Sequence, residues 1–136
     1  MTVRPAAHRL SAALAVLAIG VGVAAPAADA RGGVRLVGTA GPDTLRGGPG
    51  DDVIAGNGGG DRLYGAGGAD TLLGGAGPDH IYPGRGSDVV VAGAGNDVIR
   101  ARGGGVDQIS CGPGRDTAYV DARDRVGGDC ERVVRG

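Results

Sequence analysis

Aspartate recurs at every ninth position through the middle of this chain, and regularly spaced carboxylates are candidates for holding cations. Between residues 38 and 100, each nine-residue line has an aspartate at its sixth position and an aliphatic residue at its eighth. No arginine recurs in phase with these aspartates. Carboxylates that are brought close together repel one another unless a positive charge lies between them. The pattern therefore predicts that a cation occupies the space between neighbouring aspartates.

The chemistry of the repeat favours calcium over other divalent cations. Calcium takes about six to eight oxygen ligands in flexible geometry, and backbone carbonyls can be among them. Magnesium demands a smaller octahedral shell that keeps water, and zinc prefers histidine or cysteine, which do not recur in the repeat. Two further lines follow a one-residue shift near Ala101. The predicted ligands are Asp43, Asp52, Asp61, Asp70, Asp79, Asp88, Asp97, Asp107 and Asp116.

Each nine-residue line is interpreted as a tight turn followed by a short strand. Position four is glycine in all seven lines from residue 38 to 100, and glycine enters positive φ without steric cost. Positions seven to nine form a strand that sends position eight inward. Such short strands can coil into a solenoid with two strands per circuit. Lines n and n+2 then stack, which places Asp43, Asp61, Asp79 and Asp97 along one edge and Asp52, Asp70, Asp88 and Asp107 along the other.

The lines resemble a known calcium-binding repeat. GGPGDDVIA, residues 47–55, fits the nonapeptide GGxGxDxUx of RTX (haemolysin-type) proteins, where U is a large aliphatic residue. The resemblance runs from Gly38 to Ile99 and, after the shift, to Tyr119. It implies an all-β fold, a right-handed parallel β-roll in which the nine aspartates and loop carbonyls hold several Ca²⁺ ions between turns. Family members usually carry these repeats beside a catalytic domain, which this chain lacks, so we expect no enzymatic activity.

The first 30 residues have the features of a secretory signal peptide. A positive stretch with Arg4 and Arg9 precedes an uncharged run from Leu10 to Ala25, and small residues flank Asp29. We expect residues 1–30 to be removed and the protein to be secreted, without membrane insertion after cleavage. Residues 31–37 would lead into the first turn, residues 38–119 would form the repeats, and residues 120–136 would form a polar C-terminal cap.

The composition makes a conventional core unavailable. The chain has 31 glycines, three tyrosines and neither phenylalanine nor tryptophan. Burying about one aliphatic residue per line cannot offset the conformational entropy lost on folding. We therefore expect a chain that is disordered without calcium and folded with it. Beyond the signal, 12 arginines face 14 acidic residues, so the charge does not favour nucleic acid.

The C-terminal end carries the two cysteines. In a secreted chain, Cys111 and Cys130 are expected to form a disulfide, with a free thiol nucleophile as the alternative. Asp121, Asp124 and Asp129 could add a calcium site, although a solvated acidic face is favoured because their spacing does not fit an EF-hand.

The sequence leaves one other function open. In this alternative, the chain is an extracellular surface or matrix module that binds a protein or glycan, and calcium has only a structural role. Identical repeated aspartates argue against a catalytic carboxylate pair, which needs two different environments. The candidate interaction surface consists of the outward residues Arg62, Tyr64, Tyr82, Arg85 and Arg100.

Overall fold

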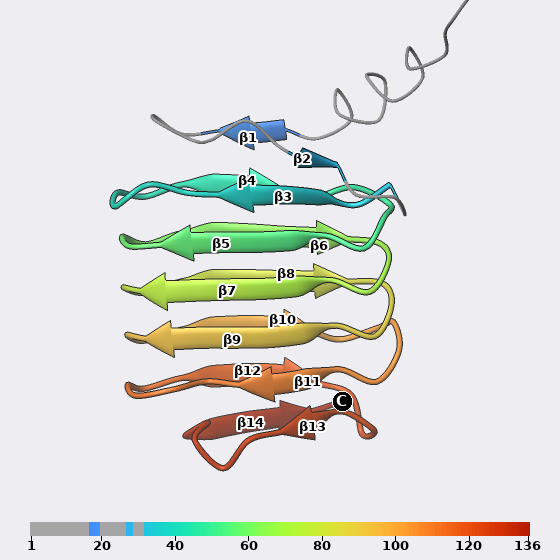
Figure 1. Ribbon diagram of the computed structural model, residues 1–136. Coiled ribbons are helices and arrows are strands. Elements are labelled where there is room, and N and C mark those ends of the chain that lie inside the picture. The colour runs from blue at the N-terminus through green and yellow to red at the C-terminus, as the bar shows by residue number, and fades with distance from the viewer. Residues whose placement is uncertain (1–16, 20–26, 29–31) are drawn as a thin grey trace, which may run out of the picture.

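The chain folds as a parallel β-solenoid, as the sequence predicts (Figure 1). The computed structural model describes residues 17–19, 27–28 and 32–136. Over these residues it contains strands and turns but no helix, and so no helical segment that is long and apolar enough to cross a membrane.

Two sheets face each other across the solenoid. One, called sheet A here, has the strand order β1 (Leu17–Ile19), β4 (Thr44–Arg46), β6 (Arg62–Ala66), β8 (His80–Gly84), β10 (Val98–Ala101), β12 (Thr117–Val120) and β14 (Arg132–Arg135). The other, sheet B, has the order β13 (Arg125–Val126), β11 (Gln108–Ser110), β9 (Val89–Ala94), β7 (Thr71–Ala76), β5 (Val53–Asn57), β3 (Val34–Val37) and β2 (Ala27–Ala28). From β3 to β14 the chain alternates between the sheets, so each pair of strands makes one circuit, about six in all.

The coil is right-handed. In Figure 1, β3 crosses the front of the molecule, the chain continues behind it as β4, and it returns to the front one level lower as β5. All pairings between β3 and β14 are parallel, and only β1 with β4 and β2 with β3 pair antiparallel. β1 and β2 are the described parts of the predicted secretory signal. The rest of residues 1–30 lies outside the described residues.

The aliphatic residues at position eight form the core. Leu45 pairs in register with Leu63, and Leu63 with Ile81, so one column runs along sheet A. Sheet B carries the matching column through Ile54 and Leu72. The predicted inward position is therefore confirmed. The nine residues at this position are at most 3% exposed: Leu45, Ile54, Leu63, Leu72, Ile81, Val90, Ile99, Ile109 and Ala118.

Side chains at position one form a second inward column. The sequence pattern predicts that this position belongs to the turn. Several strands continue past position nine, and β7 and β9 have six residues each. Because side chains alternate along a strand, the residue two places after position eight points inward again. Ala92, Ala101 and Val120 occupy this column and are at most 1% exposed. Where position one carries a side chain, as at these three residues, the position-eight side chain is therefore not the only apolar one that points inward.

From Asn57 to Gly95, the turns adopt left-handed backbone conformations at positions two and four. Gly75 and Gly77 illustrate the two positions, with φ angles of 100° and 108°. Two residues with side chains also take this conformation at position two, Asn57 with φ of 77° and Ala66 with φ of 82°. Glycine enters this region without steric cost, whereas an L-residue is strained there by about 1–2 kcal/mol.

Residues 120–136, expected as a polar cap, form a last circuit of the solenoid. β13 pairs in parallel with β11, and β14 pairs in parallel with β12. A disulfide joins Cys111, which is fully buried, to Cys130, with 5.1 Å between their Cα atoms. Val126 and Cys130 pack against the core. The predicted disulfide is present, and so the free-thiol alternative does not apply.

Candidate metal centres

The nine predicted aspartates all lie in the interior of the solenoid, just before a strand. Each is at most 4% exposed. All of them except Asp43 accept a hydrogen bond, through the carboxylate, from the backbone N–H one circuit earlier. Asp61 Oδ1 accepts from the Asp43 N–H at 2.8 Å, and Asp70 Oδ1 accepts from the Asp52 N–H at 2.7 Å. The same bond links Asp61 to Asp79, Asp70 to Asp88, Asp79 to Asp97, Asp88 to Asp107 and Asp97 to Asp116.

These bonds form the two ladders that the repeat predicts. One contains Asp43, Asp61, Asp79, Asp97 and Asp116, and the other contains Asp52, Asp70, Asp88 and Asp107. The repeat pattern does not predict that every one of these carboxylates except that of Asp43 uses one oxygen to accept a hydrogen bond from the backbone of the neighbouring rung. The position-six aspartate therefore has a structural role as well as the expected role of ligand.

The second carboxylate oxygen of most of these aspartates has no partner. Buried polar atoms in proteins are almost always hydrogen-bonded, and an ionised oxygen left unpaired in the interior is costly. A run of such atoms along each ladder fits a set of cation ligands. The buried Oδ2 atoms without a hydrogen-bond partner belong to Asp61, Asp70, Asp79, Asp88, Asp97, Asp107 and Asp116.

The two aspartates nearest the N-terminal end differ from the rest. Asp43 Oδ2 accepts a hydrogen bond from the Thr39 hydroxyl at 2.9 Å, and its Oδ1 is the atom without a partner. Asp52 uses both oxygens, accepting from the Val34 N–H at 2.8 Å and from the Gly48 N–H at 2.6 Å. Asp52 thus belongs to the ladder but offers no unpartnered oxygen.

Glycine at position one leaves room for two oxygens. A Cβ at Gly65 would lie 2.5 Å from Oδ2 of Asp70 and would also collide with the Pro83 carbonyl oxygen. A Cβ at Gly74 would lie 2.6 Å from Oδ2 of Asp79, with the Ala92 carbonyl oxygen again too close. The unpartnered carboxylate oxygen therefore lies beside a main-chain carbonyl of the next circuit. This pairing supplies the mixed carboxylate and carbonyl donors that calcium uses.

Burial makes these carboxyls unusually weak acids. Desolvation raises the pKa of Asp70 and Asp79 from 3.8 to about 7, although hydrogen bonds from the Asp52 and Asp61 N–H groups act in the opposite direction. Neighbouring carboxylates on the same ladder contribute to the rise of both pKa values. Desolvation likewise raises the pKa of Asp61, Asp97 and Asp107 to about 6, and raises that of Asp88 and Asp116.

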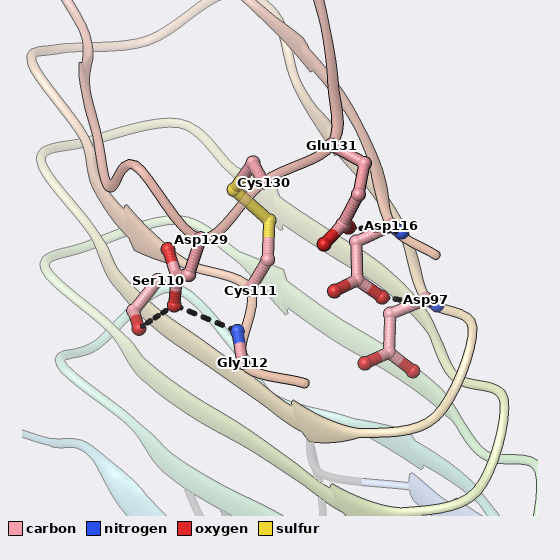
Figure 2. Close-up of a disulfide and its surroundings, with 8 residues drawn as sticks. All are labelled: Asp97, Ser110, Cys111, Gly112, Asp116, Asp129, Cys130 and Glu131. Atoms are coloured by element: carbon pink, nitrogen blue, oxygen red, sulfur yellow. Dashed lines mark hydrogen bonds between the residues drawn. A yellow bond between two sulfur atoms is a disulfide. The ribbon is translucent and has the colours of Figure 1, made fainter. Parts of the chain in front are cut away.

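Two acidic residues outside the predicted set continue the ladders into the last circuit. Asp124 Oδ1 accepts from the Asp107 N–H at 3.0 Å, and Glu131 Oε2 accepts from the Asp116 N–H at 2.8 Å. Figure 2 shows Glu131, Asp116 and Asp97 in succession along one ladder. A sequence signal for both was present, because each acid precedes an arginine and then a valine, as position six precedes positions seven and eight.

The further calcium site considered at the C-terminal end is not assembled. Asp124 has no spare oxygen, because its Oδ2 accepts from the Asp121 N–H at 2.7 Å. Asp129 lies beside the disulfide, where its Oδ2 accepts from the Ser110 hydroxyl at 2.8 Å and from the Gly112 N–H at 2.7 Å (Figure 2). The hydrogen bond from Gly112 is the largest of the effects that lower the pKa of Asp129.

A second, outer set of contacts comes from position five. Asp51 Oδ1 accepts from the Ala69 N–H at 2.8 Å, and Asn96 Oδ1 accepts from the Arg115 N–H at 2.9 Å. The residue type at position five varies from line to line in the sequence. In these turns, the side chain at position five links one loop to the next through a hydrogen bond to its backbone.

The donor set suits a hard cation. Among the described residues, no three His, Cys, Asp or Glu side chains gather into a metal-binding cluster. The unpartnered carboxylate oxygens and the backbone carbonyl oxygens beside them are oxygen donors, which suit calcium rather than zinc.

Comparison with known proteins agrees with the geometry. The family model for the RTX calcium-binding nonapeptide repeat matches residues 35–63, 64–99 and 82–118. No curated protein and no solved structure matches the chain. Since the family matches cover more than half of the sequence, the chain belongs to the RTX calcium-binding nonapeptide-repeat family.

Proposed function

We propose that this chain is a secreted protein whose β-roll is completed by calcium ions bound between successive turns. The observation that carries the proposal is the run of buried, unpartnered Oδ2 atoms from Asp61 to Asp116. We assign the metal sites to these aspartates, with Asp61, Asp70 and Asp79 the best formed because each also has glycine at position one. Asp43 is the candidate at the N-terminal end. Asp52 has no unpartnered oxygen and contributes to the structure through its hydrogen bond in the ladder.

Calcium resolves the electrostatic conflict within the ladders. Without it, ionised carboxylates are buried one rung apart, with no side chain of opposite charge between them. A cation there supplies the missing charge and a partner for Oδ2. A single site with a dissociation constant of about 10⁻⁴ M would add about 1.4 kcal/mol at 1 mM calcium. Several such sites would match the whole stability of a small domain.

An extracellular setting supplies the conditions that this fold requires. Calcium is millimolar outside cells, and disulfides such as Cys111–Cys130 persist in oxidising compartments. The charge and hydropathy pattern of residues 1–30 supports export through a cleaved signal. We propose no catalytic role, because the repeated aspartates share one environment, whereas a catalytic carboxylate pair needs two different environments.

Calcium titration of stripped protein tests the proposal. Far-UV circular dichroism should show a largely disordered chain that gains β structure as calcium reaches the millimolar range, while magnesium at the same concentrations should not replace it. Asp70→Asn should reduce the number of ions counted by calorimetry, because its unpartnered oxygen is lost. Unchanged β structure in stripped protein, or no measurable calcium uptake, would show the proposal to be wrong.

A second candidate function is an interaction module in which calcium only supports the fold. The outer face of sheet A favours it. Arg62, Tyr64, Tyr82 and Arg100 lie on that face at strand positions seven and nine. Arg85 does not, because it lies in the turn after β8.

A further inference from the structure

The outer face of sheet A carries positive charge without opposing carboxylates. Position seven contributes Arg62 and Arg132, and position nine contributes Arg46 and Arg100. All four arginines are exposed. From β4 to β14, no outward position of this sheet holds an acidic residue. The ladder aspartates are buried and cannot face a partner there.

Aromatic rings contact two of these guanidinium groups, those of Arg46 and Arg100. Arg46 lies over the ring of Tyr64 at 4.0 Å, and Tyr64 stacks on Tyr82 with 4.8 Å between centroids and an interplanar angle of 5°. Further along, Arg100 lies 5.0 Å from the centre of the Tyr119 ring. Guanidinium groups that stack in this way keep their N–H edges available for carboxylate or sulfate oxygens.

Calcium binding would change the charge that such a partner meets. Without residues 1–30, the chain has 12 arginines and 14 acidic residues, a formal net charge of −2, and each bound calcium adds two positive charges. One ion therefore neutralises the net charge, and further ions make it positive. The calcium-loaded protein attracts polyanions over a distance, whereas the stripped chain does not.

We propose that the outer face of sheet A binds an acidic polysaccharide, a polymer with regularly spaced carboxylate or sulfate groups. The inference deepens the second candidate function above and rests on it. Arginines repeated along parallel strands form a linear track, which fits a linear polyanion. Single-stranded nucleic acid fits less well, because its bases stack on open aromatic faces and here Tyr64 and Tyr82 cover each other.

The test measures binding of calcium-loaded protein to heparin and hyaluronate, with neutral dextran and an oligothymidine as comparison ligands. The double variant R46Q/R100Q should weaken binding to both acidic polysaccharides by at least about tenfold, as expected for the loss of two charged hydrogen-bonding groups. R35Q/R125Q is the matched control. It removes the same charge from exposed outward positions of sheet B and should change affinity by less than about threefold.

Three results would overturn the inference: no binding to either acidic polysaccharide, equal weakening by both double variants, or tighter binding to oligothymidine than to the polysaccharides. Circular dichroism of each sample separates this question from the calcium proposal. A protein that folds with calcium but binds no polysaccharide refutes only the assignment of this face. A protein that fails to fold with calcium refutes the proposed function itself.

Discussion

Lowering the pH should strengthen the fold of the calcium-free protein. Burial raises the pKa of Asp70 and Asp79 from 3.8 to about 7. Below pH 3.8 such a carboxyl is protonated in both the folded and the unfolded chain, and its burial carries no charge penalty. Between pH 3.8 and 7 the folded chain binds more protons than the unfolded one, so stability falls as the pH rises through this window. Above pH 7 the full penalty applies.

The size of the effect follows from the same pKa values. A shift of about three pKa units at Asp70 corresponds to about 4 kcal/mol at neutral pH. Within the window, each such carboxyl contributes a slope of about 1.4 kcal/mol per pH unit. Carboxyls on one ladder titrate as a coupled group, so the values do not simply add. One such penalty is already comparable to the stability of a marginal domain.

Circular dichroism of calcium-stripped protein between pH 7.5 and 4.5 measures the folded fraction, and urea denaturation gives the stability at each pH where the chain is folded. Calcium should be removed on a chelating resin, because soluble chelators lose affinity in acid. Sedimentation should confirm that the gain of β signal is not aggregation near the pI of about 6.0. Calcium-loaded protein should show the opposite trend, since protons compete with the metal for carboxylate oxygens. If stripped protein is no more folded at pH 5 than at pH 7.5, the reasoning about the ladders is wrong.

Five substitutions test the packing by urea denaturation of calcium-loaded protein. Ala66→Gly should stabilise the protein by up to about 1 kcal/mol, because glycine relieves the strain of the positive φ. Its control, Ala55→Gly in strand β5, should destabilise the protein by about 0.5–1 kcal/mol. Equal effects of the two substitutions would contradict the strain at Ala66. Leu72→Ala should cost about 2–5 kcal/mol, and its neighbour Leu73, 36% exposed, should cost less than about 1 kcal/mol when changed to alanine. Cys130→Ser should lower stability by about 3 kcal/mol, and a smaller loss than about 1 kcal/mol would show that the last circuit is held by its strands alone.

The regular part of this protein could be predicted from its sequence because one spacing decides several features at once. A period of nine places Asp61 and Asp79 eighteen residues apart, which is one circuit of two strands. The same period aligns Leu63 with Ile81 in the core. Two-residue alternation then fixes which side chains face inward. The ladders, the position-eight column and the solenoid therefore follow from local pattern alone.

The missed features depend on contacts that the period does not encode. Both oxygens of Asp52 are occupied because the Gly48 N–H of its own turn reaches Oδ2, while Oδ1 makes the regular ladder bond to the N–H one circuit earlier, here that of Val34. The inward column at position one arises because the strands run longer than three residues, and the glycines at that position hide its direction. Asp124 and Glu131 lie out of phase with the repeat, so periodicity alone excludes them.

The variation in circuit length explains how the solenoid continues beyond the last regular nine-residue line. The linked ladder residues are 18 residues apart up to Asp97, 19 apart where one residue is inserted before Asp107, and then 17 and 15 apart in the last circuit. The hydrogen bond between rungs stays between 2.7 and 3.0 Å throughout. The turns therefore absorb insertions and deletions, while an acidic residue before each strand keeps the rungs in register. In the last circuit Asp124 supplies that bond with no oxygen to spare, so ladder formation and metal ligation are separable properties of the same position.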